Sequence, residues 1–165
     1  MNWVESRHQG TLSKAMVFSD PDEEPSYFAY SATLRIHGRD LPFEEIERML
    51  VVAPSHTHRT GEKRRPGARP YQDDAWHFTA PVAEEKELTE HLRKLWQTVE
   101  PAVRYLNELD ATVDVFCGYR SNNGVAGLAV EPDALRIFAA LNVPFGLSVI
   151  VDSWLGERLM EPTKH

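Results

Sequence analysis

Alternating apolar and polar residues over 28–37 predict the clearest strand in the chain. Even-numbered positions form its apolar face, and the odd-numbered positions are mostly polar: Ala29, Ser31, Thr33, Arg35 and His37. A period of two with one polar side is typical of a half-buried strand. Shorter stretches of the same alternation predict strands over 75–80, 112–119 and 145–151.

Apolar residues at three- and four-residue spacing predict helices over 41–51, 84–109 and 132–141. Asp40 is placed to cap the first helix. Pro101 lies inside the second pattern, so that helix should kink there or restart. The turn signal Asn122-Asn123-Gly124 predicts that 125–130 pairs back as the second strand of a hairpin.

The expected order is β-α-β-α-β-β-α-β, after an N-terminal extension over 1–26 that would add an edge strand. Half-solvated strands and a hairpin favour an α+β fold: a mixed, largely antiparallel sheet of about five strands with helices packed on one face. We expect one domain over 27–153 and a C-terminal tail over 154–165. An open edge strand would allow a homodimer.

Charge and composition narrow the function classes. The chain has 165 residues, one cysteine (Cys117) and a net charge of −7. A single cysteine excludes an intrachain disulfide and a cysteine-rich zinc site. The net negative charge argues against general binding to nucleic acid or to a membrane surface. With no apolar run long enough to span a bilayer and no signal-peptide pattern, we expect a cytoplasmic protein. No common nucleotide-binding or hydrolase motif is present, so no cofactor is expected.

The segment 54–74 has no periodicity and an unusual charge. Between Pro54 and Tyr71 it carries five cations against Glu62 alone, namely Arg59, Lys63, Arg64, Arg65 and Arg69. A basic loop on an acidic protein can bind an acidic protein face, and the alternative is a solvated loop that neutralises nearby acids. Few aromatic residues accompany the cations, which argues against nucleic acid. The candidate binding residues are His56, His58, Arg59, Lys63, Arg64, Arg65 and Trp76.

His56 and His58 offer a second chemistry. In an extended backbone, residues two apart point the same way, as two metal ligands require. Asp73, Asp74 and His77 could complete a divalent-metal site. The alternative is a pair of loop histidines without metal, because the spacing matches no established metal motif.

Three segments carry a family resemblance: Ala32–Leu50, Ala53–Lys63 with its Pro-Ser-His, and Ala75-Trp-His-Phe. With 111–119 they resemble, over 30–151, the bacterial family catalogued as domain of unknown function 4279. The resemblance implies a small intracellular protein, and similar small domains act as immunity proteins that neutralise toxins. The family pattern marks Pro54, Gly61 and Trp76 and assigns them no role.

The leading hypothesis is a non-catalytic binding or interaction module that uses the basic loop 54–74 to contact an acidic partner protein. The alternative is a divalent-metal-dependent enzyme with His56, His58, Asp73, Asp74 and His77 around the ion. A third option is a small-ligand sensor that uses the polar face of the sheet.

Overall fold

The computed structural model describes residues 27–123 and 128–151. Its five strands are β1 (Phe28–Gly38), β2 (His56–His58), β3 (Asp74–Thr79), β4 (Thr112–Ser121) and β5 (Leu147–Val151). They form one sheet in the order β2-β3-β1-β4-β5. All neighbouring pairs are antiparallel except β4 and β5. The predicted α+β class with a mixed, largely antiparallel sheet is confirmed.

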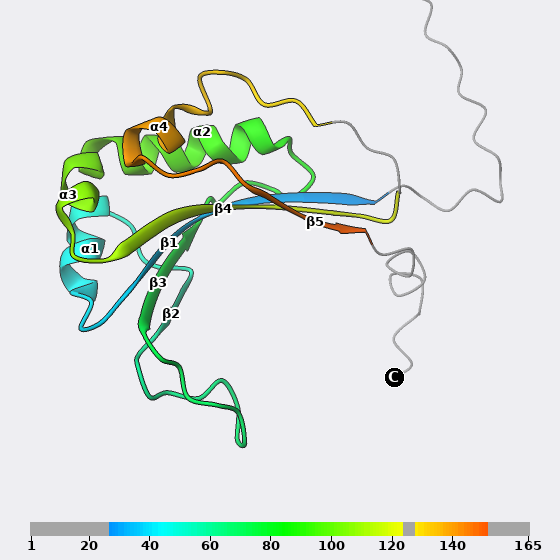
Figure 1. The fold of residues 1–165 in the computed structure, drawn as a ribbon. Coiled ribbons are helices and arrows are strands. Elements are labelled where there is room, and N and C mark those ends of the chain that lie inside the picture. The colour runs from blue at the N-terminus through cyan, green and yellow to red at the C-terminus, as the bar shows by residue number, and fades with distance from the viewer. Residues whose placement is uncertain (1–26, 124–127, 152–165) are drawn as a thin grey trace, which may run out of the picture.

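The helices lie on one side of this sheet (Figure 1). They are α1 (Phe43–Leu50), α2 (Leu88–Val99), α3 (Val103–Glu108) and α4 (Arg136–Leu141), with a 3₁₀ turn, η1 (Glu100–Ala102), between α2 and α3. Buried side chains of the helices pack on even-numbered residues of β1, such as Leu34 and Ile36, to form the core. None of the helices in the described part of the chain is long and apolar enough to cross a membrane.

Three helix predictions need adjustment, and one of them is simple: the helix expected over 132–141 begins at Arg136. The helix predicted over 84–109 begins at Leu88. At Pro101 it gives way to the 3₁₀ turn and restarts as α3, as the proline predicts. Asp40 is not the cap of α1, because that helix begins at Phe43 and Asp40 has a left-handed φ of 52°.

One strand was predicted in the wrong place. Residues 128–130 are not in a strand, and 125–127 lie outside the described residues. Strand β4 pairs with β1 on one edge and with β5 on the other, so no edge remains for a hairpin partner. The fifth strand is instead β2, inside the segment that shows no periodicity, because three residues are too few to display a period. The predicted extension over 1–26 and tail over 154–165 lie outside the described residues.

Candidate functional site

The face of the sheet opposite the helices carries polar side chains. Thr33 bonds Thr79 across β1 and β3 at 2.9 Å between hydroxyl oxygens. Arg35 donates two hydrogen bonds to the Asp114 carboxylate, at 2.6 and 2.9 Å. The strand register therefore gathers the predicted polar residues of β1, β3 and β4 on one surface.

Four histidines from three strands meet on this face, and we call His37, His56, His58 and His77 the histidine cluster. The Nε2 atoms of His37 and His77 lie 3.1 Å apart, and His56 Nε2 lies 3.2 Å from His58 Nδ1. The rings of His56 and His77 are 5.4 Å apart between centroids, which joins the two pairs. The H-x-H spacing predicted a shared direction for His56 and His58, and the structure has it.

The cluster favours neutral imidazoles. Burial lowers the pKa of His77 to about 4. The repulsion that a protonated His77 would meet from His37 and from other basic groups nearby adds to this effect. Burial likewise lowers the pKa of His37 and of His58. A bond between two imidazole nitrogens needs one ring to accept, so the short contact of His37 with His77 also requires a neutral ring.

This arrangement predicts that the fold loses stability in mild acid. An unfolded histidine titrates near 6.5 and His77 near 4, so between these values the unfolded chain binds more protons. The free energy of unfolding should fall by about 1 kcal/mol as the pH drops through this window, a figure reduced for solvent screening. Urea unfolding measured from pH 7 to pH 4 tests this. The variant His77→Asn should show a shallower dependence, and an equal slope would contradict it.

The segment between β2 and β3 is an ordered hairpin. The backbone N–H of Gly61 donates to Tyr71 O at 3.0 Å, and that of Tyr71 donates to Glu62 O at 2.8 Å. The Tyr71 ring stacks on His58, with centroids 3.6 Å apart. Gly61 has a φ of 86°, which glycine adopts without strain. Figure 1 shows this hairpin extending away from the helices and beyond the end of the sheet.

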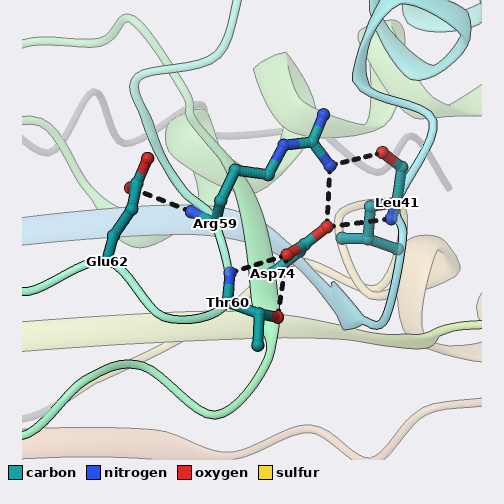
Figure 2. Close-up of polar contacts among 5 residues, drawn as sticks. All are labelled: Leu41, Arg59, Thr60, Glu62 and Asp74. Carbon is teal, nitrogen blue, oxygen red and sulfur yellow. Dashed lines mark hydrogen bonds and ion pairs between the residues drawn. The ribbon is translucent and has the colours of Figure 1, made fainter.

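Asp74 anchors the base of the hairpin (Figure 2). Its Oδ1 accepts hydrogen bonds from the backbone N–H and the hydroxyl of Thr60, at 2.8 and 2.9 Å. Its Oδ2 accepts from Arg59 Nη1 at 2.7 Å and from the backbone N–H of Leu41 at 3.0 Å. These bonds, led by the one from the Thr60 backbone, hold the pKa of the Asp74 carboxyl well below its usual range despite burial.

Arg59 is part of this anchor. Besides Asp74, its Nη1 donates to Leu41 O at 2.8 Å, and its guanidinium lies 3.5 Å from the centre of the Phe43 ring. The backbone N–H of Arg59 donates to the Glu62 carboxylate. Arg59 was predicted to contact a partner, but its guanidinium is engaged within the protein and joins the hairpin to α1.

Beyond the anchor, the hairpin ends in four exposed cations, Lys63, Arg64, Arg65 and Arg69, which we call the basic tip. Residues 63–69 contain no acidic residue. Within the described part of the chain, the side chains of the basic tip form no ion pair. Four unpaired cations on a net-negative protein concentrate positive potential at one point of the surface.

The predicted site residues fall into separate groups. His56, His58 and His77 lie together, and Asp73 is exposed. Asp74 is excluded from this group as a metal ligand, because both its oxygens are occupied by four donors. Trp76 is fully buried on the opposite face of the sheet, so it is a core residue and presents no binding surface.

Sequence reasoning left His37 and Arg69 out of the candidate site. The alternation of β1 places His37 on the polar face, but its pairing with His77 depends on the strand register, which the sequence does not display. Arg69 was counted in the loop charge, and only the hairpin shows that it shares the tip with Lys63. Across residues 27–123 and 128–151, no three histidine, cysteine, aspartate or glutamate side chains are arranged to hold a metal ion.

Comparison with known proteins identifies a family. A family model described as a domain of unknown function, DUF4279, matches residues 28–152. No curated protein and no solved structure gives a significant match.

Proposed function

The chain belongs to the DUF4279 family, whose description names no activity, and we propose from the site that it is a non-catalytic binding module whose basic tip contacts an acidic partner protein. One observation carries the proposal. Four cations without ion pairs, in the described part of the chain, are held together at the end of an ordered hairpin. Cations that form no ion pair within the protein keep their charge available to an acidic surface outside it.

The rest of the hairpin supports this proposal. Its base is fixed by Asp74 and its stem by the backbone bonds between Gly61, Glu62 and Tyr71, so less conformational entropy is lost on binding. Charge complementarity of this kind increases association rate and selects the partner. A protein is favoured over nucleic acid because Tyr71 stacks on His58 and Trp76 is buried, so neither is free to stack with bases. Because some similar small domains act as immunity proteins, a toxin is the first partner class to seek.

Charge reversal at the tip tests the proposal. The triple variant Lys63→Glu, Arg64→Glu, Arg65→Glu should lose partner recovery at least about tenfold in a tag-free pull-down from the native lysate, read by mass spectrometry. The matched control is Arg48→Glu, Lys94→Glu, Arg104→Glu, which changes net charge equally on the helices and should recover the partner as the wild type does. Equal recovery by both variants would exclude the tip as the contact.

A second candidate, a divalent-metal-dependent enzyme, is favoured by the spacing within the histidine cluster. Two nitrogens 3.1 Å apart, each bound at about 2.1 Å to one ion, subtend about 95°, which is below the tetrahedral angle but within reach of it after a small shift of the rings. The ligands of the metal ion would come from the histidine cluster. The pair His37–His77 and the pair His56–His58 would have to move together to bind one ion. It predicts stoichiometric zinc, nickel or manganese in tag-free protein and its loss in His77→Asn. Thermal stability that ignores these added ions would exclude it.

A further inference from the structure

Three aromatic residues line an open cavity at the far end of the sheet from the basic tip. The cavity has a volume of about 420 Å³ and lies where β1 begins and β4 ends. Phe28, Tyr30 and Tyr119 line it, together with Glu85, Glu87 and Ser121. A neighbouring cavity of about 360 Å³ shares Tyr30 and Glu87 and continues to Leu128. This volume suits a small ligand.

We call Phe28, Tyr30 and Tyr119 the aromatic cage. The pairing of β1 with β4 holds their rings in place. Tyr30 and Tyr119 are cross-strand partners, and their ring centroids lie 4.9 Å apart with 31° between the ring planes. Phe28 lies two residues before Tyr30 on β1. The centroids of these two rings are 6.0 Å apart, with 59° between the ring planes. Although these positions continue the apolar face of β1, Phe28 is 43% exposed. Aromatic faces that remain accessible carry negative potential and attract cations.

The charged residues that the structure shows lining the cavity are both acidic. Glu85 and Glu87 are exposed, line the cavity and form no ion pair within the described part of the chain. Among the described residues that line it there is no lysine or arginine. Burial raises the pKa of Tyr30, and the neighbouring Tyr119 and the charge of Glu87 raise it further.

We propose that the aromatic cage binds an organic cation with a quaternary or methylated ammonium group. The rings supply cation–π attraction, which for such groups is worth more than for a hydrated ammonium because less water must be removed. The two carboxylates supply net negative charge without the convergent oxygen or nitrogen ligands that a metal ion needs. The cation can belong to a free small molecule or to a methylated lysine side chain.

Binding of choline and of 3,3-dimethylbutan-1-ol, measured by calorimetry on the full chain, tests this proposal. The two compounds have the same shape, but only choline is charged. Choline should bind at least about tenfold more tightly, since a cation–π contact and two carboxylates contribute only to the charged ligand. A peptide with trimethyl-lysine, measured in parallel, identifies which source of the group binds better.

Three variants locate the site. The double variant Glu85→Gln, Glu87→Gln should weaken choline binding, whereas the exposed Glu100→Gln should not change it. Tyr30→Phe keeps a ring face and should retain binding, and Tyr30→Leu should lose it. Equal affinity for choline and its neutral analogue, undetectable binding of choline and the peptide alike, or choline binding that is indifferent to the double glutamate variant would overturn the proposal.

Discussion

Replacing Asp74 with asparagine should lower the free energy of unfolding by about 2–4 kcal/mol, measured by urea unfolding at pH 7. Both carboxylate oxygens accept two hydrogen bonds each, and all four partners are donors. An asparagine amide places an NH₂ group against two of those donors. The change also removes the partner of Arg59, while the side chain at position 74 is only 6% exposed. A buried polar group left without its partners accounts for most of the loss.

The neighbouring residue provides the matched control. Asp73 is exposed and forms no ion pair or side-chain hydrogen bond within the described residues, so Asp73→Asn should change stability by less than about 0.5 kcal/mol. Loosening the hairpin base should also reduce partner binding by Asp74→Asn, even where the protein remains folded. Equal stability of the two variants would show that Asp74 does not anchor the hairpin.

Trp76→Ala should have the largest effect on stability, a loss of about 3–5 kcal/mol. The side chain is fully buried on the core face of β3, so its removal leaves a cavity among the residues that β1 and the helices pack together. Its indole Nε1 is buried and has no hydrogen-bond partner among the described residues. Trp76→Phe therefore sacrifices no hydrogen bond and should cost less than about 2 kcal/mol.

Urea unfolding of both Trp76 variants distinguishes a core residue from a contact residue. If Trp76 is a core residue, the free energy of unfolding falls with the side-chain volume removed. Partner recovery by the folded Trp76→Phe variant then stays at the wild-type level. Unchanged stability in Trp76→Ala together with lost partner binding would contradict the placement of this side chain.

The regular parts of the fold follow from local patterns. The alternation over 28–37 predicted β1 and its polar face, and Pro101 predicted the break between α2 and α3. Patterns of this kind reflect which side chains of a single element are buried, so one segment suffices to read them. The turn signal at Asn122-Asn123-Gly124 misled the prediction because pairing is decided by which sheet edges are free, and β5 takes that edge of β4.

The candidate site also combines features of one segment, which the sequence predicts, with features that depend on contacts between distant segments. The positive charge of the loop and the shared direction of His56 and His58 are properties of one segment, and the sequence predicted both. The roles of Arg59 and Asp74 depend on contacts with Leu41 and Phe43, more than 15 residues away in the chain. Local sequence therefore identified the cations but did not separate the one that anchors the hairpin from those at its tip.

The most direct test of the central claim is the salt dependence of partner binding. The affinity of the recovered partner should be measured by calorimetry over a range of NaCl concentrations, for the wild type and for Lys63→Gln, Arg64→Gln, Arg65→Gln, Arg69→Gln. If the basic tip is the contact, wild-type affinity falls steeply with salt because exposed charges are screened. The neutralised variant then binds weakly and with little salt dependence. Equal affinity and an equal slope for the two proteins would contradict the claim.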